Sequence, residues 1–217
     1  STPGPTPTLT PTPAPTPTPE LGVYLDYGDV WSYYTKADSQ YFVSEVLNYT
    51  PNTIYTTNMV VKLFNKNVEV GSSPAKTLLA EIPPYQKTCF IAEFVNPPEW
   101  DRPDFSGGFF TVDPPIWTQG FTMKKLFYYD DQDRLTVYGS LTNASGSQVD
   151  SAQVVGTVYD DRGWTIDCAS ISANPLLIDD GAAAYFTLAF TNASHYQVQS
   201  FTLQPEGKIV PPLPAPA

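Results

Sequence analysis

Residues 46–64 read VLNYTPNTIYTTNMVVKLF and residues 141–159 read LTNASGSQVDSAQVVGTVY, and these two stretches decide the fold. A shift of 95 positions superimposes them without a gap and places Asn48 on Asn143. Few residues are identical, but the apolar positions agree in strand register, which a one-residue error would reverse. Such internal similarity indicates two copies of one β-domain.

The rest of the chain also consists of short predicted strands. Runs rich in Val, Thr, Tyr and Phe, such as Tyr41–Asn48 and Ala184–Phe190, are broken by Gly, Asp, Asn and Pro. Apolar residues nowhere recur with helical spacing over the roughly 11 positions that a helix needs. We therefore expect an all-β chain with two tandem immunoglobulin-like β-sandwiches, at residues 21–113 and 117–208.

Alternation along two matching strands predicts the centre of each core. The side chains expected to be buried are Phe90, Ala92, Phe94, Phe186, Leu188 and Phe190. Cys89 falls on the opposite face of its strand, and Cys168 has no cysteine counterpart in the first copy. In an exported protein the two cysteines would be expected to pair. Here, however, such a disulfide would have to join the two domains. Two free or buried thiols are the preferred expectation.

The two ends of the chain are rich in proline. Of 23 prolines, eight lie in residues 1–19 and four in residues 211–217. Residues 1–20 are predicted to form an extended Thr/Pro-rich arm in polyproline II conformation, and residues 209–217 a Pro-rich tail. Such an arm is either a passive linker or an O-glycosylated stalk. Its candidate acceptors are Thr2, Thr6, Thr8, Thr10, Thr12, Thr16 and Thr18. The start at Ser1 indicates a processed, extracellular product.

Three triplets match the acceptor pattern for N-glycosylation. They begin at Asn48, Asn143 and Asn192, and the first two occupy the same repeat position. The alternative is that Asn followed by Ser or Thr forms the turn at the end of a strand.

Composition argues against several functions. The net charge of −11 disfavours a nucleic-acid or anionic-membrane surface, and no apolar run approaches the ~20 residues of a membrane span. His195 is the single histidine, in a turn without a nucleophile pattern, so we expect no catalytic residues, metal or cofactor. The Asp-rich turns, such as residues 179–181, suit calcium, but the first copy lacks them, and ordinary turn formation is preferred.

A strand suited to subunit contact follows the arm. Leu21, Val23, Leu25 and Tyr27 alternate with other residues, so residues 21–28 present one apolar face. This strand could complete the open sheet of another copy, which would give a head-to-tail homopolymer. The alternative is that it is the first strand of its own domain.

Aromatic residues gather at the start of the first copy: Tyr24, Tyr27, Trp31, Tyr33, Tyr34 and Tyr41. Aromatic stripes bind sugars, but cross-strand pairing is the more common role in β-proteins. Trp100 and Trp117 flank a Pro-rich connection over residues 96–117, and we expect them to wedge the two domains together.

The second copy resembles the FxLYD-type domains, which are bacterial extracellular immunoglobulin-like modules. The resemblance rests on residues 139–146 (GSLTNASG), residues 157–163 (TVYDDRG) and Gly181 ahead of residues 186–188 (FTL). Gly156 stands where the family name places Phe. The resemblance implies a surface or secreted binding or structural module without catalytic residues.

Together these patterns predict a non-enzymatic extracellular structural protein, a subunit of a glycosylated cell-surface filament or stalk. Its expected partners are copies of itself and covalent glycans. The alternative is a carbohydrate-binding or adhesive surface module that uses the Tyr and Trp residues.

Overall fold

The computed structural model describes residues 21–25, 31–130, 134–194 and 196–211, and its regular elements are β-strands. The strands of the N-terminal half are β1 (Gly22–Leu25), β2 (Ser32–Lys36), β3 (Ser39–Tyr49), β4 (Ile54–Asn65), β5 (Val68–Thr77), β6 (Lys87–Val95) and β7 (Arg102–Thr111). Those of the C-terminal half are β8 (Trp117–Thr118), β9 (Phe121–Tyr129), β10 (Arg134–Asn143), β11 (Val149–Tyr159), β12 (Thr165–Ser172), β13 (Ala183–Ser194) and β14 (Ser200–Ile209). In the described ranges, no helix has the length and apolar character that crossing a bilayer requires.

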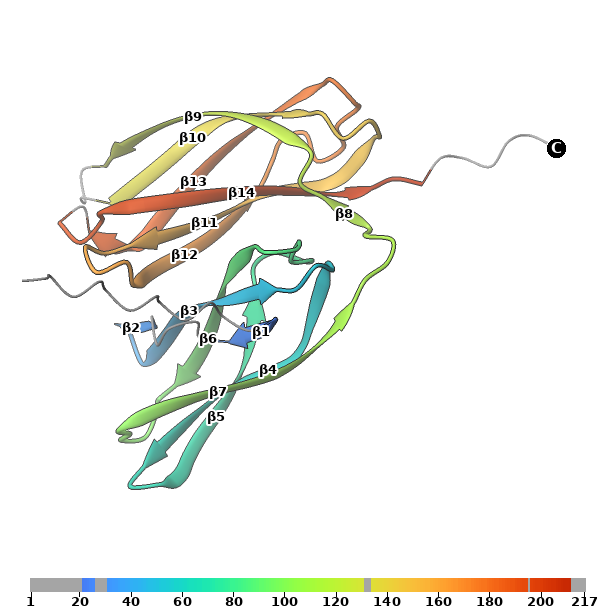
Figure 1. The fold of residues 1–217 in the computed structure, drawn as a ribbon. Helices are drawn as coiled ribbons and strands as arrows, with labels where there is room; N and C mark the ends of the chain where they lie inside the picture. The colour runs from blue at the N-terminus through green and yellow to red at the C-terminus, as the bar shows by residue number, and fades with distance from the viewer. Residues whose placement is uncertain (1–20, 26–30, 131–133, 195, 212–217) are drawn as a thin grey trace, which may run out of the picture.

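One continuous sheet, folded back on itself, forms the N-terminal half (Figure 1). Its strand order is β1-β3-β6-β5-β4-β7, and β2 also pairs with β3. β5 connects the two layers, because its first part pairs with β4 while Ala75–Thr77 pairs with β6. The layers enclose a core that includes Phe42, Leu63 and Phe90.

Two separate sheets form the C-terminal half, with strand orders β13-β10-β9 and β12-β11-β14-β8. They face each other across a core that includes Leu141, Val158 and Phe186. The side chains predicted to lie in the two cores are all buried, namely Phe90, Ala92, Phe94, Phe186, Leu188 and Phe190. The all-β prediction is therefore confirmed, and the layered sheets belong to the β-sandwich class.

The repeat found in the sequence recurs in the backbone contacts of the two halves. Ile54 forms an isolated antiparallel bridge with Ile82, and Val149 forms the same bridge with Ile178. Val149 follows Ile54 by 95 positions, the shift that aligns the sequence, and Ile178 follows Ile82 by 96, which is the shift that places Phe90 on Phe186. Equivalent residues therefore occupy equivalent places in the two halves.

The connection between the halves differs from the one predicted. β7 lies inside the Pro-rich stretch and pairs with β4, since Pro103 is tolerated in a strand at a sheet edge. Trp100 packs on Phe42 of the N-terminal core, with ring centroids 5.2 Å apart. Trp117 belongs to β8 and pairs with Lys208. The expectation of a wedge between the halves is wrong for Trp100, which packs within its own half, whereas the Trp117 N–H donates to Glu81 of the N-terminal half at 3.2 Å.

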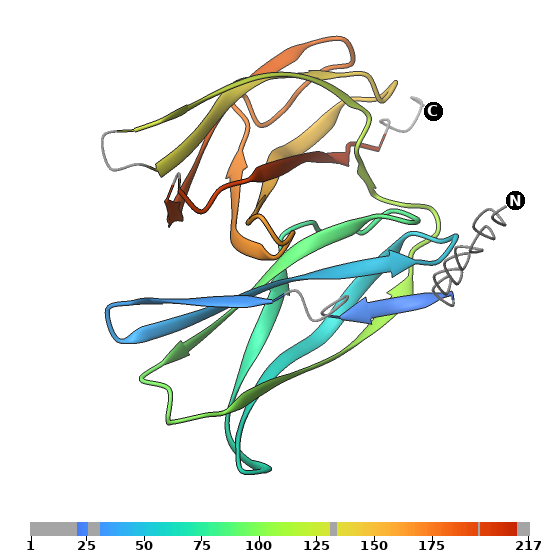
Figure 2. The ribbon, with the colours of Figure 1, turned by 60° about the vertical axis from the view of Figure 1, so that its left-hand side comes forward.

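The two halves pack through sheet faces and are joined by a disulfide between Cys89 and Cys168, with Cα atoms 6.3 Å apart. β12 of the C-terminal half lies against β3, β2 and β6 of the N-terminal half (Figure 2). The preference for free thiols is therefore wrong. Both cysteines lie on outer sheet faces, and these faces meet because the halves stack face to face.

Candidate assembly site

β1 is the strand predicted to contact another subunit. It pairs antiparallel with β3 of the same chain over its whole length. Val23 and Leu25 pack against the N-terminal core, whereas Leu21 is 70% exposed. Within one chain, this segment is thus the first strand of its own sheet, the alternative that the sequence left open. Tyr27 lies outside the described residues.

β7 and β14 are among the strands whose edges are open within the described residues. β7 ends the N-terminal sheet, and β4 is its pairing partner within the described residues. β14 pairs with β11 along its length, but on its other side the pairing among described residues is confined to Gly207 and Lys208. The N–H and C=O groups of such edges can pair with a strand of another chain.

Asn48 and Asn143, two predicted glycan acceptors, are both 0% exposed. The Nδ2 atom of Asn48 donates to the Ile82 carbonyl at 2.9 Å, and that of Asn143 donates to the Ile178 carbonyl at 3.0 Å. Each Oδ1 accepts the hydroxyl two residues further on at 2.7 Å. A glycan on Nδ2 would disrupt these bonds, so the geometry favours the turn-forming role.

The third candidate, Asn192, is half-buried beside Asp167. Its Nδ2 donates to Asp167 Oδ1 at 3.2 Å, and its backbone N–H donates to Oδ2 at 2.9 Å. Burial raises the pKa of Asp167 above its ordinary value, although these hydrogen bonds oppose the shift. The candidate O-glycosylation residues lie outside the described residues: Thr2, Thr6, Thr8, Thr10, Thr12, Thr16 and Thr18.

Aromatic residues near the start of the N-terminal half pack among themselves. Tyr34 and Tyr41 are cross-strand neighbours with stacked rings whose centroids lie 5.1 Å apart. Tyr33 stacks on Phe42 at 5.7 Å, and Trp31 lies 6.0 Å from the same ring. These contacts favour cross-strand pairing over a free sugar-binding surface at this place.

Apolar residues surround the disulfide between the halves. Val43 and Cys89 of the N-terminal half are 0% exposed, and Cys168 of the C-terminal half is 5% exposed. Leu78 and Ile91 pack against this cluster. The contact therefore has a buried apolar centre, as stable interfaces do.

A buried carboxylate, Glu45, joins the two halves beside this cluster. The Tyr159 hydroxyl donates to Glu45 Oε1 at 2.7 Å, and Lys87 Nζ lies 2.5 Å from Oε2. Burial opposes the charge of Lys87, but the Glu45 carboxylate raises the pKa of this ammonium above its ordinary value. Burial, followed by the charge of Glu45, raises the pKa of Tyr159.

A second buried carboxylate, Glu206 of β14, accepts the Ala80 N–H at 2.9 Å. Gln153 Nε2 also donates to it, at 2.5 Å. Glu206 is 0% exposed, and burial raises its pKa to about 7. Sequence reasoning missed Glu45 and Glu206; the available signal was an acidic residue within an apolar strand, as in residues 42–47 (FVSEVL).

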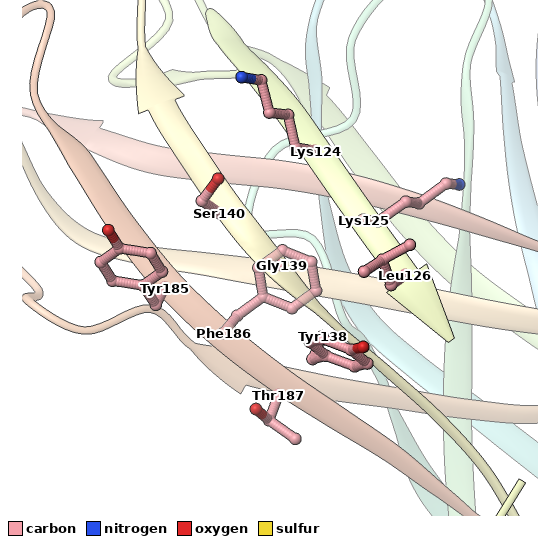
Figure 3. A pocket seen from close by; sticks show the side chains of 9 residues that line it. All are labelled: Lys124, Lys125, Leu126, Tyr138, Gly139, Ser140, Tyr185, Phe186 and Thr187. Carbon is pink, nitrogen blue, oxygen red and sulfur yellow. The ribbon is translucent and has the colours of Figure 1, made fainter. Parts of the chain in front are cut away.

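One sheet face of the C-terminal half stays exposed. The outer face of β9, β10 and β13 has a hollow of about 570 Å³ lined by Leu126, Tyr138 and Tyr185, with Lys124 and Ser140 beside them (Figure 3). Tyr185 is 67% exposed and Leu126 is 63% exposed. Sequence reasoning did not single out this face, because its residues alternate with core residues as on any sheet.

The described residues contain no group of three or more His, Cys, Asp or Glu side chains that could hold a metal ion. His195 lies outside the described residues.

No protein-family model and no curated protein match the sequence. Among solved structures, the chain is similar to a beta-glucuronidase from glycoside hydrolase family 2, with 11% identity and a TM-score of 0.25. The match covers 77% of this chain and 24% of that one.

Proposed function

We propose that this chain is a non-enzymatic extracellular structural protein, built of two tandem immunoglobulin-like sandwiches. It is a subunit of a glycosylated surface filament or stalk that assembles head to tail. The observation that carries the proposal is the position of β1, which lies at a sheet edge and contributes Val23 and Leu25 to the core. The same strand from a second copy can make the same pairing with β3.

The disulfide between Cys89 and Cys168 supports an extracellular location, because disulfides persist in oxidising compartments. The Thr/Pro-rich residues 1–20 have the composition of a spacer or glycosylated stalk. A long spacer ahead of β1 would give this strand the reach to enter a neighbouring sheet.

Deletion of residues 1–28 tests the route through β1. The expected result is loss of fibres in negative-stain images, since no donor strand remains. The deletion also uncovers the core where Val23 and Leu25 packed, so a synthetic peptide of residues 21–28 is added as a second arm. It should bind the truncated chain and raise its thermal midpoint. Fibres that persist after deletion would refute this route.

A carbohydrate-binding or adhesive module is the second candidate. Tyr138 and Tyr185 on the free C-terminal face favour it, because exposed aromatic rings can stack on sugar rings. Binding to a glycan array that is lost in Tyr185→Ala, by a protein that remains monomeric, would favour this function over the filament.

A further inference from the structure

We propose that the free outer face of β9, β10 and β13 binds the outer face of β5, β4 and β7 in a second copy of this chain. The inference rests on the proposed function and names a contact surface for it. It copies the contact by which the two halves of one chain already bind each other. In each half, we call the outer face of the layer that contains β3 or β10 the front face. The outer face of the layer that contains β4 or β11 is the back face.

Within the chain, the front face of the N-terminal half binds the back face of the C-terminal half. Cys89 and Glu45 belong to this front face, and they contact Cys168 and Tyr159 of the back face. Two faces remain without such a partner among the described residues, namely the front face of the C-terminal half and the back face of the N-terminal half. They are the repeat equivalents of the two faces already in contact.

Backbone contacts establish the equivalence of the two front faces. The Leu78 N–H donates to the Cys89 carbonyl at 2.9 Å, and the Asn174 N–H donates to the Tyr185 carbonyl at 2.8 Å. Tyr185 therefore occupies the place of Cys89. Because Cys89 is 0% exposed and Tyr185 is 67% exposed, the same place is covered in one half and open in the other.

Exposed apolar side chains gather on the open front face and on the loop beside it. They are Leu126, Tyr128, Tyr138, Leu176, Leu177 and Tyr185. Leu176 and Leu177 lie in the loop that follows Asn174. The equivalent loop of the N-terminal half follows Leu78, and its Ala80 N–H donates to Glu206 of the C-terminal half. Leu126, Tyr138 and Tyr185 line one hollow, and an exposed apolar surface of this kind marks an interaction site.

The open back face offers a complementary surface. Tyr55 and Phe110 are exposed neighbours with ring centroids 5.1 Å apart. Toward the other end of the strands, Glu69 and Asp104 lie near Lys62, whose ammonium pairs with Glu69 at 2.9 Å on this face. Both open faces thus present exposed aromatic side chains that an apolar contact can bury.

This contact joins different faces of identical chains, so it can repeat from copy to copy, and in the proposed filament it supports the assembly that β1 directs. The register predicts which residues meet. Cys168 lies opposite Thr157, and the equivalent pair in the N-terminal half is Ser72 opposite Lys62. Tyr185 of one copy should therefore lie against Ser72 of the next.

Cross-linking tests this pairing in the full chain. The double variant Tyr185→Cys/Ser72→Cys, oxidised and run on a non-reducing gel, should give a ladder of covalent multimers. Each single variant can give dimers at most. The matched control is Val95→Cys/Ser72→Cys, because Val95 is also 67% exposed but belongs to neither open face. Its products should stop at those of the single variants.

The outcomes separate the contact from the filament. A ladder within fibres supports both, and a ladder from short oligomers without fibres supports the contact and refutes the filament. Fibres without a ladder beyond the control overturn the contact alone. Monomers without a ladder overturn both. Tyr138→Asp, which places a charge on the front face, should reduce the ladder at least tenfold in the cysteine background, whereas Val95→Asp should not.

Discussion

Glu45 and Tyr159 lie in different halves of the chain, 114 positions apart, and share a hydrogen bond of 2.7 Å. Lys87 pairs with the other oxygen of the same carboxylate and lies 4.7 Å from the centroid of the Tyr159 ring. Glu45 is 2% exposed, and these two partners bind its two carboxylate oxygens. A buried carboxylate is tolerated where such partners satisfy it, and removing one of them is costly.

Tyr159→Phe should lower the free energy of unfolding by about 1.5–3 kcal/mol, because it removes a hydrogen bond to a buried carboxylate. The measurement is urea unfolding of the oxidised protein. The matched control is Tyr138→Phe on the open face, which should change the value little. Equal effects of the two substitutions would contradict the role given to the hydroxyl of Tyr159.

Sequence alone could predict the strands and the two cores, because alternation and the internal repeat are local signals. Glu45 could be placed on an outer face, but its partner Tyr159 depends on how two sheet faces stack, which no local pattern encodes. Asn143 shows the same limit. Its triplet suits a glycan or a turn, and the choice depends on the carbonyl of Ile178, 35 positions away.

Replacing both cysteines, as Cys89→Ala/Cys168→Ala, should destabilise the protein by about 2–4 kcal/mol, as expected for loss of a bridge that closes a long loop. The bridge spans 79 positions and joins the halves. Calorimetry should therefore show a lower midpoint. A midpoint equal to that of the oxidised wild type would show that the remaining contact holds the halves equally well.

Asn143→Asp should destabilise the C-terminal half by about 2–3 kcal/mol, because it places an acceptor against the carbonyls that Nδ2 now satisfies. Ser145→Ala removes the 2.7 Å bond to Asn143 Oδ1 and should cost about 1 kcal/mol. Thermal unfolding of both variants measures the difference. If the mass of native protein shows a glycan at Asn143, the turn-forming role is refuted.

Gly156→Ala should destabilise the C-terminal core by about 1–3 kcal/mol through overpacking. A Cβ at this position would lie 2.4 Å from the Phe190 ring and 2.7 Å from Leu188. Gly139→Ala should destabilise the protein more than Gly156→Ala does, because its Cβ would meet the backbone carbonyl of Lys124, which cannot rotate away. Chemical unfolding of the pair gives the order, and a milder effect at Gly139 would contradict it.

Glu206→Gln should make stability less dependent on pH. Burial raises the pKa of Glu206 to about 7, so the folded chain binds this proton more tightly than the unfolded chain does. Glu206 therefore favours folding at low pH, and its contribution is lost as the pH rises from the ordinary glutamate value toward 7. It faces the Ala80 N–H, Gln153 and the nearby Glu81 carboxylate. Between pH 5 and 7, the free energy of unfolding of the wild type, measured with urea, should fall relative to that of the variant. The expected fall is about 1.4 kcal/mol per unit by which the pKa is raised. Glu69→Gln, at an exposed glutamate, is the control, and parallel pH profiles for Glu206→Gln and wild type would contradict the raised pKa.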